Sequence, residues 1–248
     1  MRILSGAFLI LLASQPAIAQ PAPAPPQFEV ASVRVSPPIG GQNNMVGMKI
    51  DPERVRYANL GLEALMIRAF GIQSDQIVGV PSEFRYPLSY EIIGTFPADT
   101  PQDQIPLMLQ AVLADRFKLV LHRETRVSPI YALVVAKNGP KLKVSQADTT
   151  SSSNPRRGHI EYKKVTMATL ATRFHASGWT DRTVIDKTGL TGEYDFILDW
   201  TPDDAKSDDL SAPSLFTAVQ EQLGLKLEPQ TAPREFLVID HVEKPAEN

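Results

Sequence analysis

The sequence predicts an α+β protein made of two related halves, each with the element order strand-helix-strand-strand-helix-strand and with helices packed on mixed sheets. Three observations lead to this prediction. Four segments repeat apolar residues at the 3.6-residue helical period, and short β-branched and aromatic runs lie between them. The order of these patterns in the first half then recurs in the second.

Each expected helix has one apolar face. The four faces are Leu62, Leu65, Met66 and Ala69; Ile105, Met108, Leu109 and Val112; Met167, Leu170, Ala171 and Phe174; and Phe216, Val219 and Leu223. Thr166 is the expected N-cap of the third helix. The second helix has two possible starts. Thr100-Pro101 resembles a cap followed by a proline at the first helical position, but Pro106 would then lie inside the helix and remove a hydrogen bond. The alternative is that the helix begins at Pro106.

The halves align over several segments. Residues 55–72 match 160–177, residues 90–96 match 194–200, residues 110–121 match 217–228, and residues 130–135 match 235–240. The expected strands include residues 28–35 and the alternating run FLVIDHV at 236–242. The matches favour an internal duplication, and chance agreement between common element patterns is the alternative.

The N-terminus has the features of a cleavable signal peptide. Arg2 precedes a short apolar run, and Ala17-Ile18-Ala19 provides a cleavage site. We therefore expect an exported protein, periplasmic or secreted, with an uncleaved membrane anchor as the alternative. The predicted organisation is a signal peptide at 1–19, a Pro/Ala spacer at 20–27, a first half at 28–145, a serine-rich linker at 146–158 and a second half at 159–248.

Net charge, hydropathy and cysteine content each exclude or disfavour a class of function. Removal of the signal peptide changes the net charge from −3 to about −4, which argues against a nucleic-acid partner because nucleic acids require a basic face. The mature chain contains no run of about 18 apolar residues, so no transmembrane segment is expected there. The chain has no cysteine, which excludes disulfides and thiol catalysis.

The motif Lys187-Thr188-Gly189 also occurs in penicillin-recognising serine enzymes. Those enzymes need a serine three residues before a lysine, and no serine of this chain has that spacing. The motif lies between two predicted strands, and Gly189 and Gly192 are suited to a tight turn with positive φ. Asp186 or Thr188 can cap backbone amides in this turn. We therefore interpret the stretch as a turn.

No other pattern assembles a catalytic or metal site. The histidines, His122, His159, His175 and His241, are scattered without metal-ligand spacing, and Asp203, Asp204, Asp208 and Asp209 miss the calcium-loop pattern. Glu193, Asp195 and Asp199 share one strand face, which is equally typical of a solvated strand. The sequence therefore predicts no catalytic residue, no metal ligand and no cofactor, and the ligand-binding residues stay unknown.

The two tryptophans, Trp179 and Trp200, have two possible roles. Aromatic rings on an exposed surface often line a ligand groove. Core packing is the alternative, and it is favoured for Trp200 because this residue ends a predicted strand.

Several long runs resemble an exported "soil-associated" family of bacterial proteins that carry a domain of unknown function. The runs are FEVASVRVSPP (28–38), VLADRFKLVLHRET (112–125), YALVVAKNGPKL (131–142), VIDKTGLTGEYDF (184–196), PSLFTAVQEQLGLKLEP (213–229) and VIDHVEKPAEN (238–248). Phe84 stands where the resemblance leads us to expect tryptophan. Some members look fused to a membrane-embedded metallopeptidase of the antibiotic-sensor type, which implies an extracytoplasmic sensing or binding domain.

The second half is also weakly similar, in element order and small motifs, to the short N-terminal domains of secretins and TonB-dependent receptors. That similarity implies a protein partner in the periplasm. Our leading hypothesis is an exported, non-enzymatic module that binds an unknown small ligand or a periplasmic or envelope protein, with a groove between the halves as the expected site. A periplasmic hydrolase whose site is assembled only in three dimensions is the alternative, and an envelope structural protein is a third possibility.

Overall fold

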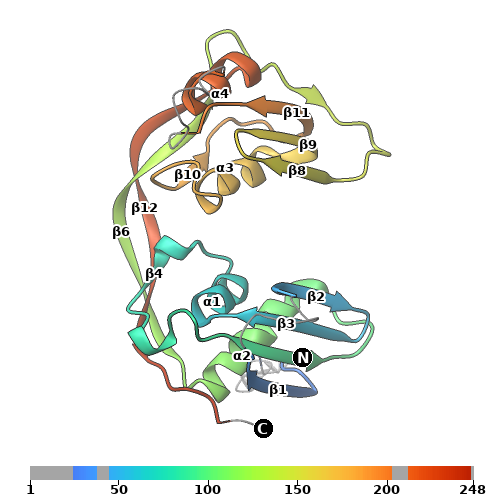
Figure 1. Cartoon of the computed structure of the whole chain (residues 1–248), viewed down its shortest axis with the longest axis vertical. Helices are drawn as coiled ribbons and strands as arrows, with labels where there is room; N and C mark the ends of the chain where they lie inside the picture. The colour runs from blue at the N-terminus through green and yellow to red at the C-terminus, as the bar shows by residue number, and fades with distance from the viewer. Residues whose placement is uncertain (1–24, 38–44, 203–211, 247–248) are drawn as a thin grey trace, which may run out of the picture.

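The computed structural model describes residues 25–37, 45–202 and 212–246. Two lobes lie at opposite ends of a long two-stranded ribbon, which forms one side of the molecule (Figure 1). The predicted signal peptide, most of the spacer and the acidic residues Asp203, Asp204, Asp208 and Asp209 lie outside the described residues.

The first lobe consists of an antiparallel four-stranded sheet and two helices. The strands are β1 (Val30–Val35), β2 (Gly47–Asp51), β3 (Arg54–Leu60) and β5 (Tyr90–Thr95), in the order β1-β5-β3-β2, and the helices are α1 (Leu62–Phe70) and α2 (Ile105–Arg116). Three short 3-10 turns, η1 (Ser74–Gln76), η2 (Ser82–Phe84) and η3 (Gln102–Gln104), link these elements. Its core contains fully buried Tyr57, Leu65 and Leu109.

The second lobe repeats this arrangement. Its sheet contains β7 (Lys143–Val144), β8 (Ser152–Arg156), β9 (His159–Thr166) and β11 (Glu193–Asp199), in the order β7-β11-β9-β8, and its helices are α3 (Met167–Ala176) and α4 (Leu215–Leu223). A separate core forms here around residues such as Leu170, Phe174 and Val219.

The ribbon consists of β6 (Val120–Val135) and β12 (Leu225–His241), which pair antiparallel along nearly their whole length. Two short strands, β4 (Ile77–Val78) and β10 (Val184–Asp186), pair parallel to β12 and β6 at opposite edges, which gives the order β10-β6-β12-β4. In β12, Leu237 belongs to the first core and Leu227 to the second; in β6, Leu121 packs against the first core and Leu133 belongs to the second. Each ribbon strand therefore contributes to both cores.

The α+β prediction is confirmed, and each half has the predicted order of strands and helices. The strand order of the two four-stranded sheets is also the same when β1, β2, β3 and β5 are matched with β7, β8, β9 and β11. Descent of the halves from one duplicated unit stays a prediction.

The boundary between the halves differs from the sequence-based expectation. The chain passes from the first core to the second within β6, and it returns within β12, so the cores do not divide at residues 146–158. Residues 152–156, inside the expected linker, form β8, because their backbone pairs with β9 although their side chains are all exposed. Burial patterns predict such a polar edge strand poorly.

The helices confirm some of the sequence-based predictions and contradict others. Thr166 caps α3 as predicted, since its hydroxyl accepts a hydrogen bond from the Thr169 amide at 3.2 Å. The α2 helix begins at Ile105, with Pro106 in the first turn, where its missing N–H costs nothing, and residues 102–104 form η3. Phe216, expected on the buried face of α4, is 42% exposed because Leu215, Ala218 and Val219 take the inward positions.

Candidate ligand-binding site

Trp179 and Trp200 come together in the second lobe, at the ends of two different elements. Trp200 directly follows β11, and Trp179 lies three residues beyond α3. Their ring centroids are 4.8 Å apart at an interplanar angle of 58°. The Phe174 ring packs edge-on against Trp179 at 6.0 Å, which connects the pair to the second core.

The two indoles line a cavity of about 410 Å³. Its other described lining residues come from the β8–β9 turn, the end of α3, the residues after β11 and the start of α4; they are Arg157, Gly158, Ser177, Gly178, Pro202 and Leu215. This volume is within the range of small-molecule sites in proteins. Trp200 has both of the roles considered for the tryptophans. It packs in the core, where it is only 5% exposed, and it also lines the cavity.

Gly158 fixes one wall of the Trp179/Trp200 cavity. Its φ is +70°, and a Cβ atom there would lie 2.5 Å from the Trp200 carbonyl oxygen and 3.1 Å from Cδ of Pro202. The Trp200 amide donates to the Gly158 carbonyl at 2.8 Å. Only glycine permits both this backbone conformation and this close approach. The glycine therefore sets the position of the β8–β9 turn against Trp200.

The polar groups of this cavity are suited to binding. Arg157 supplies a guanidinium donor and Ser177 a hydroxyl that can donate or accept. The described residues that line the cavity include no histidine, aspartate or glutamate. General acid–base chemistry at this place would therefore need a group from elsewhere.

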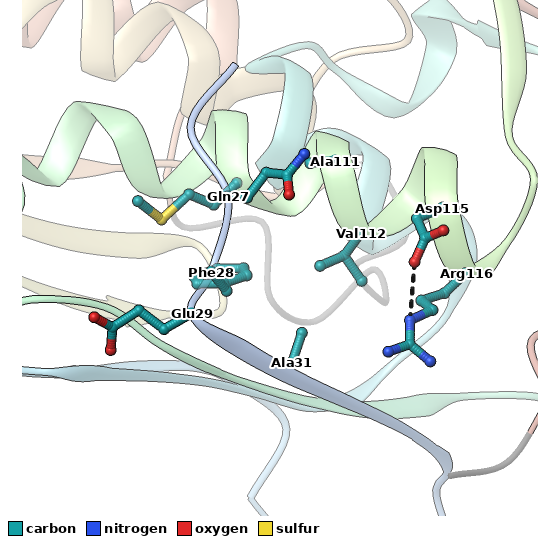
Figure 2. Close-up of a pocket in the computed structure, with 9 residues that line it drawn as sticks. Gln27, Phe28, Glu29, Ala31, Ala111, Val112, Asp115 and Arg116 are labelled. Carbon is teal, nitrogen blue, oxygen red and sulfur yellow. Dashed lines mark ion pairs between the residues drawn. The ribbon is translucent and has the colours of Figure 1, made fainter. Parts of the chain in front are cut away.

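A second cavity, of about 420 Å³, lies between the start of β1 and α2 in the first lobe (Figure 2). Phe28 forms part of its wall and packs over Gly94, where a Cβ would lie 2.6 Å from the ring. Asp115 and Arg116 pair with each other at 3.1 Å on the α2 side. No sequence pattern indicated this cavity, because it depends on how the first strand crosses the helix.

Each histidine lies near an acidic residue, and His122 and His241 lie on facing strands at the same end of the ribbon. His122 contacts Asp240 at 2.9 Å and Glu124 at 3.1 Å on the ribbon. The other pairs are His159 with Asp199 at 2.5 Å, His175 with Asp75 at 3.7 Å and His241 with Glu243 at 2.8 Å. Within residues 25–37, 45–202 and 212–246, no group of three acidic or histidine side chains could hold a metal ion.

The three acids of β11 lie on the outward face of their strand, with buried Tyr194 and Phe196 on the other face. Asp195 accepts hydrogen bonds from the Ser145 hydroxyl at 2.5 Å and from the Lys164 amide at 2.9 Å. These two bonds lower the pKa of Asp195, which makes it a poor general acid. Its contacts instead fix the local backbone of β9.

The stretch that contains Lys187-Thr188-Gly189 is a turn between β10 and β11, as predicted. Asp186 accepts hydrogen bonds from the Thr188 amide at 2.9 Å and the Thr188 hydroxyl at 2.7 Å. Gly189 has φ +70°, but the positive φ expected for Gly192 is wrong. Gly192 is instead needed for space, because a Cβ there would lie 2.9 Å from the Tyr194 hydroxyl.

A family model described as a protein of unknown function (DUF3738) matches residues 63–242. The chain belongs to this family. The match confirms the predicted resemblance to a domain of unknown function, whereas soil association and similarity to secretin or TonB-receptor domains stay predictions. No curated protein and no solved structure matches the chain.

Two further observations bear on this family member. Phe84, where tryptophan was expected, is 3% exposed in the first core, so this departure concerns packing. Among the helices of the described residues, none has both the length and the apolar character needed to cross a membrane.

Proposed function

We propose that this protein is an exported, non-enzymatic binding module, periplasmic or secreted, whose second lobe binds a small ligand with a sugar or aromatic ring. The observation that carries the proposal is the pair of indoles, 4.8 Å apart, that line a cavity of about 410 Å³ beside Arg157 and Ser177. Indole faces attract the apolar faces of sugar rings and aromatic rings, and nearby polar groups fix their orientation.

The contacts of the acids and histidines favour binding over hydrolysis. A hydrolase of the kind considered as the alternative needs carboxylates or histidines that converge on one cleft. In the described part of the chain, each histidine pairs with an acid, and none of these pairs lines the tryptophan cavity.

Intrinsic fluorescence tests the proposal directly, because Trp179 and Trp200 are the only tryptophans of the chain. We would titrate the chain from Gln20 onward with cell-wall fragments, oligosaccharides, β-lactams and peptides. A ligand at about 100 times its dissociation constant adds roughly 2.7 kcal/mol to the free energy of unfolding. We expect one class to change the emission saturably and to raise the melting temperature.

Two variants locate the site. Trp179→Ala should weaken binding at least tenfold and leave the fold intact, because Trp179 is only partly buried. Phe216→Ala is the matched control: it removes a 42% exposed aromatic side chain that lines a different cavity of the same lobe, so affinity should not change. Equal affinity of Trp179→Ala and the unaltered chain would refute the proposed site.

A separate observation supports the protein-interaction form of the proposal. On the edge strand β2, Met48 and Ile50 are 44% and 38% exposed, although their β3 partners Tyr57 and Val55 are buried. The matching edge strand β8 contains Pro155, which blocks pairing. An extended strand of a partner protein could therefore add to β2. A photo-crosslinker at Met48 should then capture a partner that the same group at Ser153 on β8 does not.

A further inference from the structure

Asp75 lies where the first lobe, the second lobe and the ribbon meet. It belongs to η1, directly beyond α1 of the first lobe. Its carboxylate accepts two hydrogen bonds from Arg234 on β12, at 2.6 Å and 3.0 Å, in a bidentate arrangement. From the second lobe, the Thr183 hydroxyl donates to Asp75 at 3.1 Å, and Nε2 of His175 lies 3.7 Å away.

Arg234 depends on this carboxylate. Its side chain is only 7% exposed, and its cross-strand neighbour in the ribbon is Arg126, a like charge. Arg126 has its own acidic partner, Glu124, at 2.5 Å. Both guanidinium groups also lie near the Phe236 ring, at 5.1 Å and 5.6 Å from its centroid. Asp75 is therefore the counter-charge that makes burial of Arg234 tolerable.

The ribbon also connects the two lobes. Each lobe has its own hydrophobic core, and the ribbon strands run from one to the other. Between the stretches that pair with β10 (at Tyr131–Leu133) and with β4 (at Leu237–Val238), the ribbon has only two strands, and a two-stranded segment twists more easily than a wider sheet. Polar contacts cross directly from η1 and its cap residue Gln73 to the second lobe, where Thr183 and His175 make them.

We propose that Asp75 is a latch that holds the two lobes at a fixed angle about the ribbon, and that loss of its bonds lets the lobes move relative to each other. Gln76 assists the latch, since its side-chain amide donates to the Glu235 carbonyl at 2.6 Å and ties η1 to β12. The free edges β2 and β8 face each other across the space between the lobes (Figure 1), so this movement would change their separation.

Distances between spin labels test the latch. The chain has no cysteine, so Lys49→Cys on β2 and Ser153→Cys on β8 place one label on each lobe without competing thiols. We expect a single narrow distance distribution for the otherwise unaltered chain. Asp75→Asn, which keeps the side-chain shape and removes the charge, should broaden or displace this distribution.

Two further variants keep the test decisive. Thr183→Val removes the hydroxyl that reaches Asp75 and leaves the Asp75–Arg234 pair intact, so it should broaden the distribution less, even if Asp75→Asn fails to fold. Glu235→Gln is the control, because it breaks an exposed ion pair with Arg123 on the same ribbon and should change nothing. A distribution unchanged by Thr183→Val and by folded Asp75→Asn would overturn the latch.

Discussion

Asn59 and Lys164, 105 positions apart in the sequence, share one unusual backbone conformation, with φ of 54° in each. Both lie at irregularities in the strand pairing, between Tyr57 and Leu60 in the first lobe and beside the Tyr194–Phe196 shift in the second. In each lobe the strand then leads directly into a helix, α1 or α3. This irregularity in the strand pairing therefore directs the chain into the first helix of each lobe.

Lys164 should be sensitive to the shape of its replacement. A left-handed conformation costs a non-glycine residue about 1–2 kcal/mol, and a β-branched side chain more. We expect Lys164→Val to lower the free energy of unfolding by about 2 kcal/mol. Lys164→Gly should change it by less than about 1 kcal/mol, because relief of strain offsets the greater freedom of the unfolded chain. Urea unfolding measures the unfolding free energies of both variants. Lys163→Val is the control: it changes a neighbouring strand position with ordinary φ and should leave the unfolding free energy nearly unchanged.

Gly158 and Gly178 offer a matched pair beside the tryptophan cavity, since their φ values are +70° and +69°. A Cβ at Gly178 meets nothing within 4 Å, whereas one at Gly158 would lie 2.5 Å from the Trp200 carbonyl. Gly178→Ala should therefore cost about 1 kcal/mol of stability from conformation alone. Gly158→Ala should cost about 2–4 kcal/mol and shift the native tryptophan emission. Equal losses for the two variants would contradict the close contact with Trp200.

Removal of the Asp75 charge should destabilise the protein markedly. Loss of one member of a buried ion pair costs about 3–5 kcal/mol. Because the Asp75 side chain is 32% exposed, we expect Asp75→Asn to cost about 2–3 kcal/mol. Glu235→Gln, whose ion-pair partners are about half exposed, should cost less than about 0.5 kcal/mol. Chemical unfolding at neutral pH measures the loss of unfolding free energy in each of the two variants.

The same carboxyl predicts a pH dependence. Burial raises the pKa of Asp75, but hydrogen bonds from Arg234 and Thr183 and the positive charges of Arg234 and His175 outweigh it and lower the pKa below its ordinary value of 3.8. The stability contributed by ionised Asp75 is therefore present above about pH 4 and is lost as the pH falls through the lowered pKa. The difference in unfolding free energy between the unaltered chain and Asp75→Asn should stay constant down to about pH 4 and shrink as the pH falls further. A difference that grows as the pH falls would show the opposite linkage.

The separation of the two cores should be visible in unfolding experiments. Leu65 and Leu170 are both fully buried, one in each core, and both tryptophans report on the second lobe alone. Each Leu→Ala change should cost about 2–5 kcal/mol in its own core. Leu170→Ala should shift the transition followed by tryptophan emission, and Leu65→Ala should shift it less than the transition followed by far-UV circular dichroism. Coincident shifts for both variants would indicate that the ribbon couples the cores into one unit.

Local rules were sufficient for much of the fold. The apolar faces of α1 and α3, the Thr166 cap and the turn at Asp186–Gly189 each depend on residues within a few positions of one another. Phe216 and β8 were mispredicted for a different reason: the exposure of Phe216 depends on how α4 is rotated against its lobe, and β8 exists because β9 offers a pairing partner.

Only part of the candidate site could be predicted from local sequence patterns. Trp179 and Trp200 could be singled out because they are the only two tryptophans of the chain. Nothing local indicated that Gly158 would press against Trp200, or that Asp75 would meet Arg234, 159 positions away. These contacts depend on register and lobe placement.

Local sequence patterns were enough to predict the α+β class and the order of elements in each half, because hydrophobic period, caps and turn residues act over short distances. Long sequence runs were enough to predict the resemblance to a family of unknown function. Sequence patterns did not predict that β6 and β12 form one ribbon that serves two cores, that the tryptophans share a cavity, or that Asp75 contacts both lobes. The physical reason is that antiparallel pairing over 16 residues and an ion pair across the molecule both depend on positions far apart in the chain, which local periodicity does not encode.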